Sequence, residues 1–490
     1  MNLKYIWLLF ILLGLTACND VEDILEENNV EIPTDEALPE LNAGSADFSN
    51  YVSLGNSLTS GMTDGALFIA GQENSYPNLL SQQFALAGGG DFTQPWMSDN
   101  TGGILLGATQ IAPNRLVTIG GPPLSLEDVI GSVTPTTNLL TNNPTGPFNN
   151  LGVPLAKAIH LLSPGYGDLN GLFVSPATAN PFYVRMATSS TASVIGDAMA
   201  QSPSFFSLWI GANDVQGYAG TGGDGSNPIT DQPTFDFAIN TLISTLTSGG
   251  AQGVVANIPY VSDLPHYTAV GYNPVPLDAA TAGALNAGYA TYNGGLQYAL
   301  ANSLITAEEV AARTILFEES ESNTMVLIDE TLTDLSSFGI PSYRQSTSTD
   351  LFVLPLGSLI PAGYGTQIPL EDKWVLLPTE QDELTAATDA FNATIEAAAT
   401  SAGLAFVDAN AIFHEIATTG FATGNFILTS NLVTGGVLSL DGLHGTARGN
   451  ALTANAFMKA IDVTYGSNFE ASGNLLNVGD YPTNYSPSLQ

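Results

Sequence analysis

The sequence predicts an α/β protein, a three-layer α/β/α sandwich built on a central parallel sheet. Short, densely apolar runs that end in glycine, asparagine or proline recur along the chain. Most are too apolar to alternate, as expected of strands that are covered on both faces. Helical patterns separate several of these runs, and a strand–helix–strand rhythm is typical of a parallel sheet between helices. Such a sheet binds ligands beyond the carboxyl ends of its strands.

Five runs are the expected strands of this sheet, at residues 51–54, 151–153, 205–210, 253–258 and 404–407. Helical patterns follow at residues 235–246 and 384–402, where apolar residues recur at helical spacing. Each pattern lies between two expected strands.

Two regions do not fit this rhythm. Residues 88–146 are rich in Gly, Thr, Pro and Asn, which predicts long surface loops with little regular structure. Residues 263–375 contain a helix candidate near 279–304 and a proline-punctuated remainder, which we interpret as an insertion that forms a lid or side domain. The expected organisation is a signal peptide at residues 1–17, an acidic tether at 18–48, a core in two parts at 49–262 and 376–465, the insertion at 263–375 and a C-terminal tail at 466–490.

The charge balance excludes several classes of partner. The 490 residues include 46 acidic and only 9 basic side chains, a formal net charge of -37. This field repels nucleic acid and anionic lipid surfaces, and it argues against polyanionic substrates. No His-Glu-x-x-His motif and no His/Cys cluster is present in the sequence, so we expect neither a metal nor another cofactor.

The N-terminus predicts export. Lys4 precedes an apolar run over residues 5–15, which is too short to span a bilayer as a mature helix. Leu15-Thr16-Ala17-Cys18 resembles a lipobox, in which Cys18 is acylated; the alternative is an ordinary secretory signal with an incidental cysteine. We expect an outer-membrane lipoprotein on the cell surface or the periplasmic face. Because Cys18 is the chain's only cysteine, no disulfide can form within the chain.

The stretch Ser-Leu-Gly-Asn-Ser-Leu-Thr-Ser-Gly at residues 53–61 places Ser57 between an expected strand and an expected helix. Free backbone N–H groups point outward at such a junction, which suits an oxyanion. The alternative is that Ser57 only caps the helix.

A serine hydroxyl needs a base, and the chain has four histidines: His160, His266, His414 and His444. His444 alone has an aspartate, Asp441, three residues ahead on a tight Asp-Gly turn. That spacing can bring the carboxylate to one imidazole nitrogen and leave the other for Ser57. The alternative is a turn aspartate with a capping histidine.

Further blocks lie after the other expected strands, at Asn150-Leu151-Gly152-Val153-Pro154 and at Gly211-Ala212-Asn213-Asp214. In this order with Ser57 and Asp441/His444, they resemble the blocks of the SGNH hydrolases, also called GDSL esterases and lipases. The resemblance covers residues 49–262 and 380–465 but not the insertion. It implies a flavodoxin-like sandwich and a serine ester hydrolase that works through an acyl-enzyme.

The resemblance also implies roles for single residues. Ser57 is the nucleophile, His444 the base and Asp441 its orienting partner. The oxyanion hole would use the Ser57 N–H, the Asn213 side chain and a backbone N–H of the second block. The family's usual glycine there falls on Leu155, which cannot adopt a positive φ cheaply and whose bulk would crowd the site. Gly152 is the second candidate, and the sequence leaves the choice open.

The expected substrate carries an ester and is a small molecule, a lipid or an acylated glycan. Two departures from the family pattern, Asn56 and Gly445, remove no catalytic group. An α/β-hydrolase nucleophile elbow is excluded because Thr59 replaces its second glycine. The alternative function is a non-catalytic surface lipoprotein that binds glycans with a degenerate form of this fold, and Leu155 is the feature that favours it.

Overall fold

A five-stranded, all-parallel sheet lies at the centre of the computed structural model, which describes residues 37–489. Its strands are β1 (Tyr51–Gly55), β6 (Asn150–Gly152), β7 (Phe205–Trp209), β8 (Gln252–Ala256) and β15 (Ala405–Val407). All five coincide with the predicted runs. The spatial order β6-β1-β7-β8-β15 is the 2-1-3-4-5 order of a doubly wound sheet, in which the connections reverse between β1 and β7.

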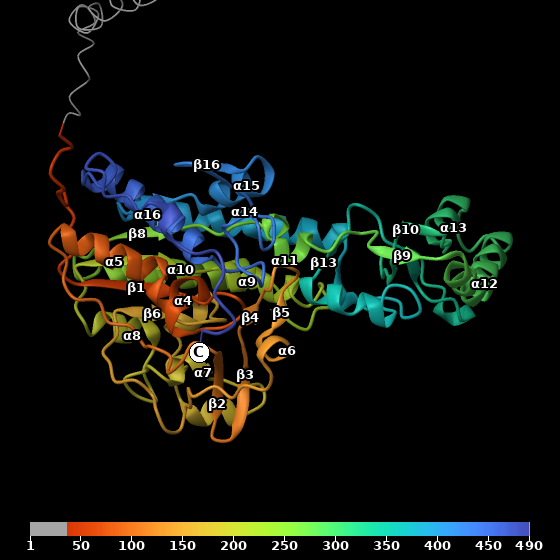
Figure 1. Cartoon of the computed structure of the whole chain (residues 1–490), viewed down its shortest axis with the longest axis horizontal. Helices are drawn as coiled ribbons and strands as arrows, with labels where there is room; N and C mark the ends of the chain where they lie inside the picture. The colour runs from red at the N-terminus through yellow and green to blue at the C-terminus, as the bar shows by residue number, and fades with distance from the viewer. Residues whose placement is uncertain (1–36, 490) are drawn as a thin grey trace, which may run out of the picture.

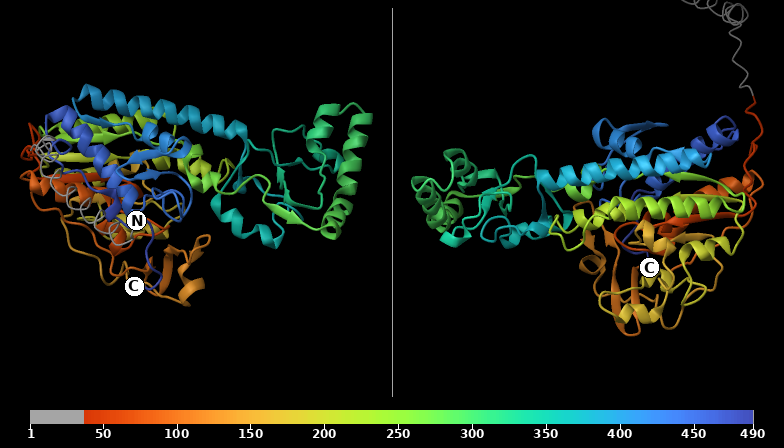
Figure 2. Two further views of the ribbon diagram at one scale, coloured as in Figure 1. Left: turned by 45° about the horizontal axis from the view of Figure 1, so that its top comes forward. Right: turned by 180° about the vertical axis from the view of Figure 1, so that it is seen from behind.

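Helices pack on both faces of the sheet (Figures 1 and 2). On one face α5 (Tyr76–Leu86) meets α16 (Ala447–Tyr465), and the rings of Tyr76 and Phe457 are 4.8 Å apart. The crossover helices α8 (Val194–Met199), α10 (Gln232–Thr247) and α14 (Pro378–Ser401) cover the other face. Here Phe235 stacks on Phe391 at 3.9 Å. The molecule is therefore a mixed α/β structure with helical layers around a parallel sheet.

The segment 88–146 contains more regular structure than the sequence predicts. It forms two hairpins and a short helix: β2 (Gly102–Leu106) with β3 (Thr109–Asn114), β4 (Leu116–Val117) with β5 (Leu124–Ser125), and α6 (Leu126–Ile130). The expectation of surface loops was wrong here because these strands are short and turn-rich. Their pairing comes from neighbours in space and not from a local apolar pattern.

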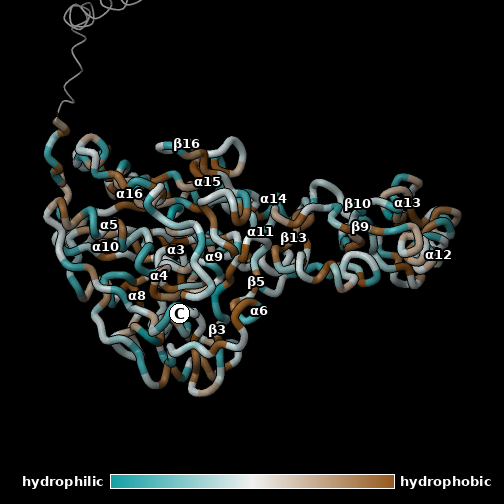
Figure 3. The backbone as a smooth tube through the Cα atoms, viewed as in Figure 1, coloured by the Kyte–Doolittle hydropathy of each residue, from teal (hydrophilic) through white to brown (hydrophobic). Residues whose placement is uncertain are grey.

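Residues 263–375 extend as an arm from one end of the sandwich (Figure 1). The arm has apolar clusters of its own, and one packs Met325, Leu327 and Phe352 together with no exposed surface. Figure 3 shows apolar and polar residues interleaved along the arm, as in a small hydrophobic core with a solvent-exposed polar surface. Its helices are α11 (Pro265–Thr268), α12 (Ala279–Ala301) and α13 (Ala307–Arg313), and its strands are β9 (Val275–Leu277), β10 (Ser320–Asn323), β11 (Val326–Ile328), β12 (Tyr343–Gln345), β13 (Leu351–Phe352) and β14 (Val375–Leu376).

Both ends of the described chain are bound to the sandwich. Ser45 N donates to Tyr465 O at 2.8 Å and Phe48 is buried, so the end of the predicted tether packs against the fold. At the other end the buried Arg115 donates to the carbonyls of Ser486 and Leu489. The predicted signal peptide, Cys18 and the tether to residue 36 lie outside the described residues. Across residues 37–489, no helix combines the length and apolarity that crossing a membrane requires.

Candidate active site

Three neighbouring strands end together at the site. In the sheet register Gly55 lies opposite both Gly152 and Trp209. The turns that carry Ser57, Leu155 and Asn213 therefore start from the same edge, at the point where the chain connections reverse. This edge is where doubly wound sheets bind ligands.

Ser57 opens a one-turn helix, α3 (Ser57–Ser60), directly after β1. Asn56 is the cap of this helix, because its side chain accepts from Leu58 N at 3.0 Å. The alternative that Ser57 is the cap is therefore wrong. Ser57 is 7% exposed, and within the described chain neither its N–H nor its hydroxyl has a hydrogen-bond partner. Both groups are free to face a ligand.

Asp441 and His444 form a close pair, with Asp441 Oδ2 2.7 Å from His444 Nδ1. The same carboxylate accepts four further hydrogen bonds, from the N–H groups of Gly65, Leu443 and His444 and from the Ser439 hydroxyl. Burial opposes the charge of Asp441, but the attraction of His444 and these hydrogen bonds outweigh burial and hold the pKa of Asp441 well below its ordinary value. The pair is thus a fixed carboxylate and an imidazole whose Nε2 is left free.

The segment that follows α3 holds the Asp441/His444 loop. Asp64 N donates to Ser439 Oγ at 2.9 Å, and Leu440 N donates to Asp64 Oδ1 at 3.1 Å. Asp64 is 1% exposed, its Oδ2 has no partner among the described residues, and burial raises its pKa to about 7. The serine turn and the histidine loop are thereby bound to each other, although no hydrogen bond joins Ser57 to His444 in the described chain. Such catalytic contacts often form only with substrate bound.

His266 holds the other side of this loop. Its Nδ1 lies 2.8 Å from Asp441 O, a carbonyl that can only accept, so Nδ1 carries the proton. Its backbone N also donates to Gly442 O at 3.2 Å, and a Cβ on Gly442 would lie 2.4 Å from His266 N. Asp263, three residues before His266, pairs with His414 at 3.1 Å and not with His266. Sequence reasoning thus missed the contact between the arm and the loop.

Leu155 adopts a positive φ of 66°, which the sequence argument considered too costly. Its side chain is 65% exposed, so it is not packed into the core. Its N–H has no acceptor among residues 37–489. The N–H of Gly152, by contrast, donates to Asn150 Oδ1 at 3.0 Å. Leu155 is therefore the available donor, and Gly152 is not.

Two adjacent residues of α9 (Ala212–Ala219) hold the loop that carries Leu155. Asn213 Nδ2 donates to Ala156 O at 3.0 Å, which uses one of its two amide hydrogens. Asp214 Oδ2 accepts from Ala158 N at 2.9 Å. Burial raises the pKa of Asp214 to about 6 despite this bond. Asn213 therefore retains one donor, on a loop whose backbone is fixed.

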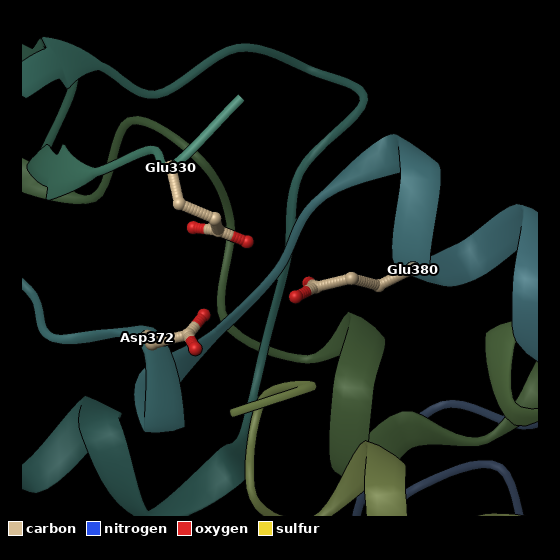
Figure 4. Close-up of side chains that lie close together, drawn as sticks. All are labelled: Glu330, Asp372 and Glu380. Atoms are coloured by element: carbon tan, nitrogen blue, oxygen red, sulfur yellow. The ribbon is translucent and has the colours of Figure 1, made fainter. Parts of the chain in front are cut away.

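A separate carboxylate cluster lies where the arm joins α14 (Figure 4). Oxygen atoms of Glu330, Asp372 and Glu380 lie within 4.8 Å of one another, as a hard cation would require. Burial, followed by the neighbouring acidic charges, raises the pKa of Asp372 to about 6 and that of Glu380 to about 8. The two carboxyls therefore resist ionisation where they lie together. The cluster shares no residue with the Ser57 site.

Comparison of the chain with protein families, with curated proteins and with solved structures finds no match.

Proposed function

We propose that this protein is a serine ester hydrolase of the SGNH type. Ser57 is the nucleophile, His444 the general base and Asp441 the residue that orients it. Leu155 N–H, Ser57 N–H and the free amide hydrogen of Asn213 form the oxyanion hole.

The reaction would proceed in two halves. His444 Nε2 takes the proton as Ser57 Oγ attacks the acyl carbonyl, and the three donors stabilise the charge that develops on the carbonyl oxygen. His444 then gives this proton to the departing alcohol, which leaves an acyl group on Ser57. Water, deprotonated by the same imidazole, cleaves the acyl-enzyme and regenerates the serine.

The observation that carries the proposal is the Asp441–His444 pair at 2.7 Å on a loop that is hydrogen-bonded to the serine turn. A turn aspartate with a capping histidine explains the bonds from Leu443 N and His444 N, but it does not require the carboxylate to contact His444 Nδ1 or to accept from Gly65 N. Leu155 supports the proposal as well, because its N–H has no acceptor among the described residues and its backbone adopts the positive φ of 66°.

The test is labelling with a fluorophosphonate, which reacts only with an activated serine, together with hydrolysis of a short-chain aryl ester. We expect the parent to be labelled, and Ser57→Ala and His444→Ala to lose labelling and at least about a thousandfold in kcat. His414→Ala is the matched control, since its side chain is 58% exposed. An unlabelled, folded parent without esterase activity would refute the proposal.

We also propose that Cys18 carries the lipid that anchors the protein to the outer membrane. The support is the lipobox-like sequence before Cys18 and the acidic segment after it. Metabolic labelling with an alkyne fatty acid should mark the full-length chain but not Cys18→Ser. Equal labelling of both would refute the anchor.

A further inference from the structure

Arg115 is a fully buried arginine whose side chain is held by backbone carbonyls. Its guanidinium donates to Asn100 O at 2.8 Å, to Ser486 O at 2.7 Å and to Leu489 O at 2.9 Å. A buried charge is costly unless it is hydrogen-bonded, so these carbonyls are what allow Arg115 to occupy this position. Two of the three belong to the segment 485–489.

Tyr485 fixes the other end of this segment. Its hydroxyl donates to Ala70 O at 3.1 Å, and its ring meets the ring of Phe68 edge-on at 5.1 Å. The guanidinium of Arg115 lies over the same ring, 5.4 Å from its centre. Phe68 is fully buried, so the three side chains form one packed unit. The segment 485–489 thereby rests on the stretch of chain that follows α3.

A series of hydrogen bonds leads from Arg115 to the Asp441/His444 loop. The N–H of the residue after Arg115 donates to Asp64 O at 2.7 Å. Asp64 N donates in turn to Ser439 Oγ at 2.9 Å, and Leu440 N donates to Asp64 Oδ1 at 3.1 Å. Because these groups are hydrogen-bonded one after another, a shift of Arg115 is passed on to the loop.

The charge of Arg115 acts in the same direction as these bonds. Burial raises the pKa of Asp64 to about 7, while the bond from Leu440 N and the attraction of Arg115 oppose that rise. Arg115 and Asp64 are 0% and 1% exposed, so water screens their attraction little. An ionised Asp64 is also the stronger acceptor for Leu440 N. Arg115 therefore favours the form of Asp64 that holds the loop more firmly.

We infer that the segment 485–489 is a positioning element of the proposed active site, which holds Arg115 and, through Asp64, fixes the Asp441/His444 loop. The inference rests on the proposed function, since that loop carries the proposed base. The segment acts through other residues and supplies no group to the reaction. Its loss should lower kcat and leave KM nearly unchanged, because the base is misplaced while the groups that bind the substrate remain.

A chain that stops at Asn484 removes the segment, and a synthetic peptide can return it. The peptide is Tyr-Ser-Pro-Ser-Leu-Gln, residues 485–490. On a short-chain aryl ester the truncated chain should lose at least about tenfold in kcat, with KM within about twofold of the full-length value. Saturating peptide should restore kcat to within about threefold of the full-length value. A truncated chain as fast as the full-length protein, or no recovery with the peptide, would overturn the inference.

Variants of the peptide show whether the recovery uses the contacts described. Tyr485→Ala removes the hydroxyl and the ring, so half-maximal recovery should require at least about tenfold more peptide. Ser488→Ala changes an exposed side chain and is the matched control, which should act like the parent peptide. Arg115→Met in the truncated chain removes the donors to both carbonyls of the segment and should abolish recovery. A Tyr485→Ala peptide as effective as the parent would also overturn the inference.

A spectroscopic signal separates this inference from the esterase activity. The proton between His444 Nδ1 and Asp441 Oδ2, which are 2.7 Å apart, should give a low-field NMR resonance in Ser57→Ala protein. This resonance should disappear when the Ser57→Ala chain stops at Asn484 and return with the peptide. If the full-length protein cleaves no ester but the resonance follows the peptide, the esterase proposal fails and the positioning role stands. If esters are cleaved and the resonance is the same with and without the segment, the positioning role fails alone.

Discussion

At the level of single residues, the site depends on groups that fix the position of the Asp441/His444 loop. Asp64 holds it from the serine side and His266 from the arm side. Neither residue would touch the reacting atoms, so both act by positioning. Small errors in the placement of a catalytic base are costly, because proton transfer requires the base within hydrogen-bond reach.

His266 can be tested through the single hydrogen bond that its ring donates. His266→Phe removes the Nδ1 donor and should lower kcat by about tenfold to a hundredfold while KM changes little. His266→Asn restores a donor near the same position and should recover most of the loss. Steady-state kinetics on a short-chain aryl ester measure both. Equal losses in the two variants, or a loss confined to KM, would show that the bond to Asp441 O does not position the base.

At the level of elements, the serine turn fits only because β6 ends in a glycine. A Cβ on Gly152 would lie 2.3 Å from Ser60 N, a backbone atom of α3 that cannot move without moving Ser57. Gly55 has the same role in β1, where a Cβ would lie 2.1 Å from Thr59 Oγ1 of α3. The two glycines bring the helix down onto the sheet edge.

Gly152→Ala should therefore destabilise the fold by about 1–3 kcal/mol through overpacking and lower kcat by displacing Ser57. Urea unfolding and ester hydrolysis measure the two effects. Gly249→Ala, with open space at its Cβ, should stay within about 0.5 kcal/mol of the parent. A Gly152→Ala protein as stable and active as the parent would mean that α3 does not depend on this close approach.

The sequence predicts elements well where the signal is local. The five sheet strands are dense apolar runs, and α12 and α14 are long patterns that need no distant partner to be recognised. The hairpins within 88–146 were not predicted, because β4 and β5 have only two residues each and β3 exposes most of its side chains. Their existence depends on pairing across the fold.

In the candidate site, too, the residues with a local sequence signal were predicted, and the contacts between distant parts of the chain were not. Ser57, Asn213 and the Asp441/His444 pair follow recognisable strands or share a short motif. The contacts of Asp64 and His266 with the Asp441/His444 loop were not predicted, because their partners lie 376 and 175 positions away along the chain. The conformation of Leu155 was misjudged because only the surrounding loop, held by Asn213 and Asp214, fixes its φ.

At the level of the whole molecule, the junction between arm and sandwich carries acidic groups that resist ionisation. Glu380 lies in the first turn of α14, while Glu330 and Asp372 belong to the arm. The pKa of Glu380 rises from an ordinary 4.5 to about 8, so the folded chain holds a proton that the unfolded chain releases. The stability that this proton provides is complete below the ordinary value and is lost as the pH rises through about 8.

Glu380→Gln should remove this dependence, since an amide can still accept from Leu377 N without carrying charge. Between about pH 5 and pH 8 the parent should lose stability relative to the variant, at a slope of at most about 1.4 kcal/mol per pH unit. Urea unfolding across this range measures the difference. Glu396→Gln, an exposed change on the same helix, is the control. Its free energy of unfolding should depend on pH in the same way as that of the parent. If the free energy of unfolding of Glu380→Gln depends on pH in the same way as that of the parent, Glu380 ionises normally.

The buried Arg115 has a consequence for the order in which the protein is made. Its guanidinium stays without the carbonyls of Ser486 and Leu489 until those two residues have been synthesised. His444, the proposed base, likewise follows Ser57 by most of the chain's length. A ribosome that has reached residue 438 has therefore made the nucleophile and the oxyanion donors but no base to activate the serine. The proposed reaction can therefore begin only after His444 has been synthesised, long after Ser57.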